Sequence, residues 1–314
     1  MQMSWYGRRA RRGSRCGIVV LAVLAVLAVL AAGAASPVLA VGRSSAGVVT
    51  ASVQVARTAA GSIGYREVGR GSPLLLITGL GASMDDWAPS FVDALATEHR
   101  VVIFDNAGVG QTSALGTRLT ITAMANQTSA LISSLRLGHP AVLGWSLGGM
   151  VAQALAVLHR SQVSRLILAA TQPGTGKALP VPRAAARAVN SSNPARTLSV
   201  LFPPSQGAAQ AAYVKGILSY PGFYQASAAV KTAQNAALAQ WFAGRQPAGR
   251  KVHDLRLPTL VTDGTDDALD PVGNDRMLAS LIPKARLVLY RDAGHAFWFQ
   301  DESRFVPRID RFLR

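Results

Sequence analysis

Ser146 lies in the sequence Gly-Trp-Ser-Leu-Gly, which has the residue types needed to present one serine hydroxyl as a nucleophile. In such a G-x-S-x-G pattern, a sharp turn from a strand into a helix raises the serine above the end of a sheet. Side chains two positions before and after the serine would collide in this turn, so Gly144 and Gly148 are the predicted elbow glycines. The pattern alone also fits an ordinary Gly/Ser-rich turn.

A nucleophilic serine is commonly activated by a histidine base, which a carboxylate orients. His295 lies in a Gly-His turn near the C-terminus, a setting in which a lone histidine is often only structural. Residues 106–253 contain no Asp or Glu, so the carboxylate cannot come from that interval. The acidic residues that remain near the end of a C-terminal strand are Asp263, Asp266, Asp267 and Asp270.

Short continuous apolar runs predict the elements that position these residues. Such runs are typical of strands buried on both faces of a parallel sheet. They alternate with segments of helical spacing, which predicts a mostly parallel, doubly wound α/β sheet. The predicted strands are residues 74–77, 101–104, 141–143, 166–168, 260–261 and 286–290, and the clearest helices are residues 121–135, 147–158 and 304–313. Alternation at residues 52–57 and 63–68 predicts an antiparallel hairpin at a sheet edge.

Ligands on such sheets bind beyond the carboxyl ends of the strands. The first buried run ends in a glycine-rich turn around Leu80, in which backbone N–H groups can face a site without side chains in the way. The second run ends at Asp105, which we expect to brace its turn rather than to react.

The chain leaves this alternation at about residues 173–250. This stretch is rich in alanine, is interrupted by prolines and carries scattered aromatic residues. A long excursion from an α/β core is more often a lid than a structureless loop. We therefore predict an inserted, mostly helical cap over the site.

The N-terminus has the order of a secretory signal: arginines, an apolar run, and a small-residue cleavage site ending at Ala40. We expect residues 1–40 to be the signal, 41–50 a linker and 51–314 the folded domain, in a secreted or cell-envelope-associated protein. An uncleaved membrane anchor is the alternative, because the apolar run is long enough to span a bilayer. The only cysteine, Cys16, lies in this segment, which excludes a cysteine nucleophile from the mature chain.

Loss of the five signal arginines lowers the net charge from +16 to +11. The interval 106–253 carries thirteen Lys and Arg and no acid, which leaves two interpretations: association with an anionic substrate, membrane or envelope surface, or an Arg-rich, Ala-rich composition without a role. The basic residues are scattered and no nucleic-acid reading motif accompanies them, so no nucleic-acid partner is expected.

With these motifs in order at strand ends, the chain resembles the serine hydrolases of the α/β-hydrolase superfamily over nearly all of residues 51–314. The resemblance implies that Ser146 is the nucleophile and His295 the general base. The family spacing of a glycine, an aspartate three residues on and a proline maps onto Gly264, Asp267 and Pro271. Asp267 is therefore the predicted acid, with Asp266 as second choice, and Asp263 and Asp270 are expected to be solvated turn residues.

The resemblance also implies an oxyanion hole made of the backbone N–H groups of Leu80 and Leu147. Two positions depart from the pattern of many relatives: Thr78 replaces a histidine and Ala107 replaces an arginine. These departures put the substrate class in doubt rather than the Ser-Asp-His set.

The sequence thus predicts an exported serine hydrolase that cleaves a small-molecule ester, lactone or related acyl bond through an acyl-enzyme. Alternatives on the same triad are a perhydrolase of the non-haem haloperoxidase type and a carbon–carbon bond hydrolase. An alternative of another class is a non-catalytic ligand-binding protein of the same fold. No metal and no organic cofactor is expected, and the sequence does not indicate an oligomeric state.

Overall fold

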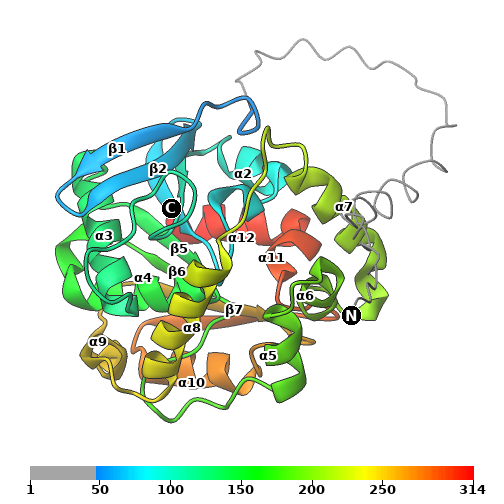
Figure 1. Cartoon of the computed structure of the whole chain (residues 1–314). Helices are drawn as coiled ribbons and strands as arrows, with labels where there is room; N and C mark the ends of the chain where they lie inside the picture. Colours follow the sequence, from blue (N-terminus) through cyan, green and yellow to red (C-terminus); the bar gives the residue numbers. More distant parts are fainter. Residues whose placement is uncertain (1–46) are drawn as a thin grey trace, which may run out of the picture. The chain divides into compact units, whose positions relative to one another are not determined.

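The computed structural model of the chain describes residues 47–314 (Figure 1). The predicted signal or anchor, and most of the predicted linker, lie outside the described residues. The described part contains an eight-stranded sheet with the order β1-β2-β4-β3-β5-β6-β7-β8, which confirms the predicted mostly parallel α/β class. No helix within residues 47–314 has both the length and the apolar character needed to cross a membrane.

The first two strands form the predicted hairpin at the sheet edge: β1 (Gln54–Thr58) pairs antiparallel with β2 (Gly61–Val68), and β2 pairs antiparallel with β4 (His99–Phe104). All other pairings in the sheet are parallel. The parallel strands are β3 (Ser72–Ile77), β5 (Ala141–Trp145), β6 (Leu166–Ala169), β7 (Thr259–Gly264) and β8 (Ala285–Tyr290), together with β4.

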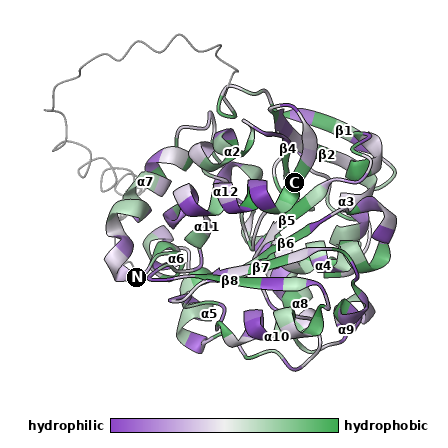
Figure 2. Cartoon of the chain, turned by 180° about the vertical axis from the view of Figure 1, so that it is seen from behind, coloured by the Kyte–Doolittle hydropathy of each residue, from purple (hydrophilic) through white to green (hydrophobic). Residues whose placement is uncertain are grey.

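Side chains of the central strands enter two separate cores, one on each face of the sheet. In β3, Leu74 and Leu76 pack into one core while Leu75 and Ile77 pack into the other, as the two-residue period of a strand requires. This double burial explains why these strands are continuous apolar runs, and Figure 2 shows the hydrophobic strands β5 and β6 at the centre of the molecule.

Helices supply the other half of each core. One face is covered by α2 (Pro89–Leu95), α11 (Phe297–Gln300) and α12 (Glu302–Leu313), and the other by α3 (Ile121–Ser134), α4 (Leu147–Leu158) and α10 (Gly273–Leu281). Short 3-10 turns lie at Met84–Asp86 (η1), Arg160–Gln162 (η2), Pro204–Gln206 (η3) and Val252–Asp254 (η4).

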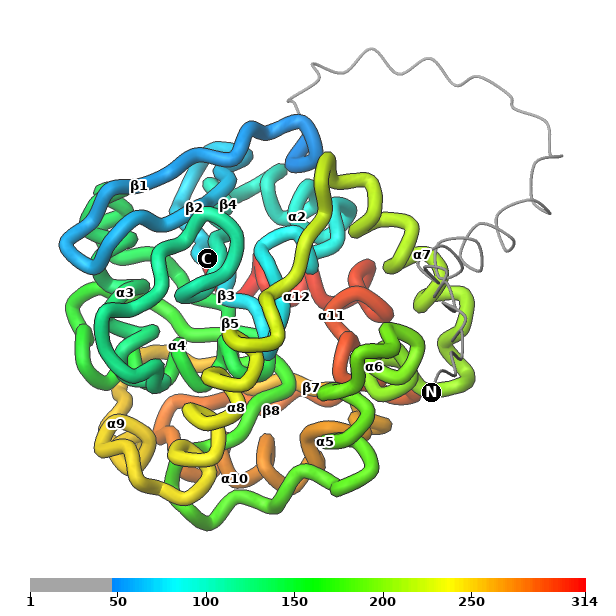
Figure 3. The backbone as a smooth tube through the Cα atoms, in the orientation of Figure 1, coloured from blue at the N-terminus to red at the C-terminus, as the bar shows by residue number. Residues whose placement is uncertain are grey.

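The chain between β6 and β7 is mostly helical and is called the insertion below (residues 173–250). Figure 3 traces it in green to yellow. Its helices are α5 (Arg183–Val189), α6 (Pro194–Leu201), α7 (Gly207–Ile217), α8 (Ala228–Phe242) and α9 (Pro247–Arg250). Local capping starts two of them: the Asn193 side chain accepts from Ala195 N at 3.0 Å, and Ser227 Oγ accepts from Val230 N at 3.3 Å.

Candidate active site

Ser146 lies on a strained turn between β5 and α4. Its φ of 58° and ψ of −121° place a non-glycine residue in a region that L-residues rarely adopt. Two hydrogen bonds hold this conformation: Ser146 N donates to Ala169 O at 2.9 Å, and Thr171 Oγ1 donates to Ser146 O at 2.7 Å. The strand–turn–helix context expected of a nucleophile elbow is therefore present.

The glycines beside Ser146 have no room for a side chain. A Cβ at Gly144 would overlap the carbonyl oxygen of Gly148, and a Cβ at Gly148 would overlap the carbonyl oxygen of Ile77. These contacts are with backbone atoms, which cannot rotate away. The helix α4 can therefore begin directly above the strand end only because both positions lack a side chain.

His295 and Asp267 meet in the loops that follow β8 and β7. The imidazole Nδ1 lies 2.6 Å from Asp267 Oδ2, and the two side chains are 4% and 0% exposed. The other carboxylate oxygen, Asp267 Oδ1, accepts from Leu269 N at 2.6 Å and from Asp270 N at 2.9 Å. Asp267 is thus held by backbone donors while it faces the histidine.

Asp266, the second choice from the sequence, does not reach the histidine. It is exposed and its Oδ1 accepts from the hydroxyl of its neighbour Thr265 at 3.1 Å. Of the two adjacent aspartates, the structure therefore brings only Asp267 to His295.

The serine turn and the histidine loop are tied together by Trp145. Its indole N–H donates to His295 O at 2.9 Å, and the Trp145 and His295 ring centroids are 5.7 Å apart. The polar contacts of residues 47–314 include no hydrogen bond between Ser146 Oγ and His295 Nε2. Such a bond commonly tightens only when substrate binds.

The turn after β3 lies against the serine. A Cβ built on Gly79 would be 3.3 Å from Ser146 Cβ, so the predicted oxyanion residue Leu80 follows directly on a residue that touches the nucleophile. Within residues 47–314, neither Leu80 N–H nor Leu147 N–H donates to a protein acceptor. Leu147 is also the first residue of α4, where the helix dipole favours negative charge.

The insertion contacts this oxyanion turn through α8. The buried side chain of Gln234 accepts from Gly81 N at 2.8 Å, and Ala226 N donates to Gly81 O at 3.0 Å. The two contacts join segments about 150 residues apart in the chain. No local pattern could have predicted them, so Gln234 was missed by the sequence analysis.

Asp105 has the contacts of a bracing residue. One oxygen accepts from Met84 N at 2.9 Å and the other accepts from the Tyr224 hydroxyl at 2.5 Å. Burial raises the pKa of Asp105 to about 6, against the opposing effect of the Tyr224 and Met84 hydrogen bonds. The residue connects the turns after β3 and β4 to the insertion, and within residues 47–314 it forms no hydrogen bond with His295.

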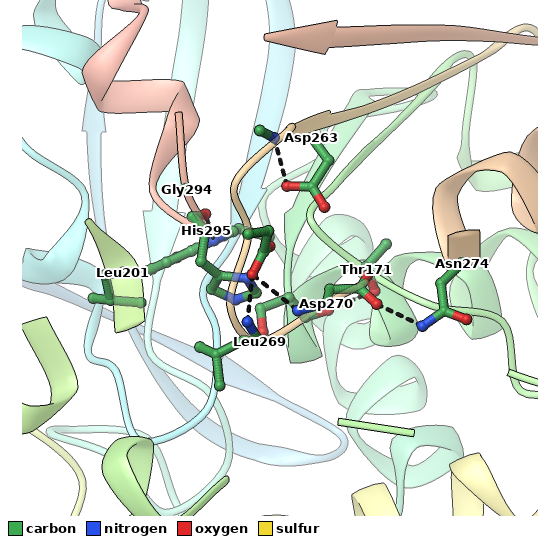
Figure 4. Close-up of polar contacts among 12 residues, drawn as sticks. Thr171, Leu201, Asp263, Leu269, Asp270, Asn274, Gly294 and His295 are labelled. Carbon is green, nitrogen blue, oxygen red and sulfur yellow. Dashed lines mark hydrogen bonds and ion pairs between the residues drawn. The ribbon is translucent and has the colours of Figure 1, made fainter. Parts of the chain in front are cut away.

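The expectation that Asp263 and Asp270 are solvated turn residues is wrong. Both side chains are buried, because β7 continues to Gly264 and the start of α10 packs over the following loop. Burial, followed by the charge of Asp267, raises the pKa of Asp263 well above its ordinary value and that of Asp270 to about 7. Asp270 Oδ1 accepts from Asn274 Nδ2 at 2.7 Å (Figure 4).

Asp275, in the first turn of α10, is a further buried acid that the sequence analysis missed. Burial raises its pKa well above the ordinary value, with the charge of Asp270 adding to the effect. An aspartate in the first turn of a helix is common on protein surfaces, so the sequence alone gives no sign that this one is buried.

Comparison with known proteins identifies the family of the chain. Residues 72–302 match the family described as the alpha/beta hydrolase fold. The chain belongs to the α/β-hydrolase family. Because the family model and the similar depolymerase and esterase agree, the chain is a hydrolase.

Proteins similar to this hydrolase include a depolymerase and an esterase. A poly(3-hydroxyalkanoate) depolymerase from Ectopseudomonas oleovorans is 31% identical over 257 residues, with coverage of 77% of this chain and 84% of the relative. Among solved structures, a thermophilic esterase from Thermogutta terrifontis is 28% identical with a TM-score of 0.65, covering 84% of this chain and 98% of that one. An alpha/beta hydrolase fold protein from Chitinophaga pinensis has a TM-score of 0.76 at 26% identity and covers 85% and 98%, respectively.

Proposed function

We propose that this hydrolase is an exported serine esterase that cleaves a small-molecule ester or lactone through an acyl-enzyme. The observation that supports it most is the 2.6 Å contact between His295 Nδ1 and Asp267 Oδ2, joined through Trp145 to the strained turn of Ser146. A histidine held in this way on Nδ1 keeps Nε2 free to act as a base.

The proposed reaction begins when Ser146 Oγ attacks the substrate carbonyl carbon and His295 Nε2 takes the hydroxyl proton. Asp267 stabilises the resulting imidazolium. The negative charge on the carbonyl oxygen is bound by the N–H groups of Leu80 and Leu147, which lack protein acceptors within residues 47–314. The intermediate collapses as the imidazolium gives its proton to the leaving alcohol, and water activated by His295 then releases the acid.

The insertion is proposed to be the lid of this site. It contacts the oxyanion turn at Gly81 and the brace at Asp105, through Gln234 and Tyr224 respectively. Its basic character gives a carboxylate-bearing substrate or an anionic surface a favourable electrostatic environment.

Labelling with a fluorophosphonate tests the nucleophile. Wild-type protein is expected to form one covalent adduct, and Ser146→Ala is expected to form none and to lose p-nitrophenyl ester hydrolysis. A chain-length series from C2 to C16, with a lactone and a peracid assay alongside, then defines the substrate. Turnover only in the peracid assay would favour the perhydrolase alternative, and neither labelling nor turnover would favour a non-catalytic binding protein.

Export is a separate part of the proposal and has its own measurement. We expect the mature protein to begin near Val41, because the small-residue pattern of a signal-peptidase site ends at Ala40. Mass spectrometry of the N-terminal peptide from the native host checks this. A peptide that retains the apolar segment 17–35 in the membrane fraction would instead indicate an anchor.

A further inference from the structure

Three buried carboxylates converge behind the loop that carries Asp267. Asp263 is the next-to-last residue of β7, Asp270 follows the loop and Asp275 lies in the first turn of α10; together they are called the carboxylate cluster. One oxygen from each lies within 4.8 Å of the others, and the three residues are 0%, 2% and 0% exposed. They are the only such group of three or more metal-ligating side chains within residues 47–314.

Most oxygens of the carboxylate cluster have no hydrogen-bond partner in the described part of the chain. Asp263 Oδ1 accepts from Gly264 N, and Asp270 Oδ1 accepts from Asn274 Nδ2, each at 2.7 Å. Asp263 Oδ2, Asp270 Oδ2 and both oxygens of Asp275 are buried without a hydrogen bond. A buried carboxylate with unpaired oxygens is strongly disfavoured unless a donor or a cation satisfies it.

Among residues 47–314, no lysine or arginine forms an ion pair with the carboxylate cluster. None of the ion pairs in the described part of the chain involves Asp263, Asp270 or Asp275. The charge of His295 lowers the pKa of Asp270, but His295 is already paired with Asp267. Something other than lysine or arginine must therefore hold the three carboxylates together.

We propose that the carboxylate cluster binds one calcium ion. Its donors are all oxygens, which favours a hard cation over zinc or copper. Calcium binds oxygens at about 2.3–2.6 Å, so oxygens that share one ion lie at most roughly 5 Å apart, and the three oxygens, all within 4.8 Å of one another, meet this condition. Magnesium normally keeps several waters, for which a fully buried cluster is poorly suited.

Protons are the competing way to hold these carboxylates. A proton shared by Asp263 and Asp275 would join only these two side chains and would leave Asp270 Oδ2 without a partner. A cation at their centre satisfies all three at once. It also offsets negative charge beside Asp267, which must stay ionised to act in the proposed reaction.

The bound ion would fix the two ends of the loop 264–269, because Asp263 and Asp270 flank it. This loop positions the Asp267 carboxylate through the N–H groups of Leu269 and Asp270. The ion is thus assigned a positioning role and takes no part in bond making. The binding test below does not depend on the proposed esterase activity.

Metal content and thermal stability of the full chain test this inference. Protein produced with calcium and then desalted is expected to contain about one calcium per chain by elemental mass spectrometry. Because the site is buried, the ion is removed by incubation with EGTA in urea below the unfolding midpoint. The stripped protein is expected to have a Tm lower by roughly 5 °C or more, restored by calcium but not by magnesium.

The variant Asp275→Asn separates calcium from protons. With a calcium site, this variant loses the ion and the calcium-dependent rise in Tm, whereas the matched control Asp254→Asn, at an exposed position, keeps both. With protons, the neutral amide relieves repulsion and Asp275→Asn raises the Tm with or without calcium. That result overturns the proposal. The proposal is also overturned if the wild-type protein contains no bound metal and its Tm does not respond to EGTA or calcium. Stabilisation by magnesium alone overturns the choice of ion. If Asp275→Asn does not fold, the wild-type stoichiometry still decides.

Discussion

At the scale of single residues, the two carboxylate oxygens of Asp267 have different partners. Oδ2 faces His295, and Oδ1 is held by two backbone N–H groups. The carboxylate therefore has little freedom to rotate away from the imidazole. An amide in its place would present an N–H group to His295 Nδ1 or lose the backbone bonds, and either change disfavours the tautomer with a free Nε2.

We expect Asp267→Asn to lower kcat for a p-nitrophenyl ester by about 10⁴-fold. Asp266→Asn, at the exposed neighbouring position, is the matched control and is expected to keep wild-type kcat and KM. Steady-state kinetics on both purified variants checks this. If Asp266→Asn were inactive and Asp267→Asn active, the catalytic acid would be Asp266 and not Asp267.

The identity of the candidate residues was more predictable than their surroundings. Ser146, His295 and Asp267 follow strand ends that short apolar runs reveal, and the absence of acids from 106–253 narrows the choice of carboxylate. The burial of Asp263 and Asp270 was not predictable from the sequence. It depends on how α10 packs over the loop, and a run of aspartates with glycine and threonine is typical of exposed turns.

At the scale of elements, α8 supports the oxyanion turn. Gln234 Oε1 accepts from Gly81 N at 2.8 Å, one residue beyond Leu80, and the Lys231 stem would lie 3.3 Å from a Cβ on Gly81. Gly81 has a φ of +73°, so its backbone conformation suits glycine and leaves the turn narrow. The helix of the insertion thereby fixes the orientation of backbone that carries a proposed oxyanion donor.

We expect Gln234→Leu to lower kcat by roughly tenfold while KM changes little, because the misplaced donor acts on the transition state. The unpaired Gly81 N–H should also lower the free energy of unfolding by about 1–3 kcal/mol. Ester kinetics and urea unfolding measure the two effects. Thr232→Ala, at an exposed position of the same helix, is the control; a purely structural role for Gln234 would lower stability without changing kcat.

The elements themselves were largely predictable, and their long-range contacts were not. Buried parallel strands and the edge hairpin were predicted because apolar runs and alternation are local signals. The contact of Gln234 with Gly81 spans 153 residues, and no spacing rule connects them. The boundaries of the predicted cap, at about residues 173–250, stay a prediction. The helices α5–α9 show the secondary structure of this stretch, but they do not show that it forms a separate unit.

At the scale of the whole molecule, the buried acid Asp86 links the turn after β3 to the insertion. Asp86 accepts from Ser83 N at 2.8 Å and from Gln225 Nε2 of the insertion at 3.4 Å. Its backbone oxygen accepts from the Tyr213 hydroxyl at 3.0 Å. Burial raises the pKa of Asp86 to about 7 from 3.8, although the Ser83 and Gln225 hydrogen bonds oppose the shift.

This pKa makes stability depend on pH in a definite direction. Between about pH 4 and pH 7 the folded protein retains a proton on Asp86 that the unfolded chain has lost, so the free energy of unfolding falls as the pH rises through this window. Above about pH 7 the group contributes no further change. In Asp86→Asn we expect the fall between pH 4.5 and pH 8 to be smaller by roughly 2–3 kcal/mol.

Urea unfolding at several pH values measures this difference. Asp254→Asn, which removes an exposed carboxylate, should keep the wild-type slope. An Asp86→Asn profile that runs parallel to the wild type would show that the group titrates alike in the folded and unfolded states.

The tryptophans around the histidine have a consequence for spectroscopy. Ring centroids of Trp87, Trp145 and Trp298 lie 4.7–5.8 Å from one another, and Trp145 donates its N–H to the backbone of His295. Indoles locked this closely couple their electronic transitions, so the protein should give an intense near-ultraviolet circular dichroism spectrum. That optical activity arises beside the proposed catalytic base, and it would report the loss of local order there without any substrate.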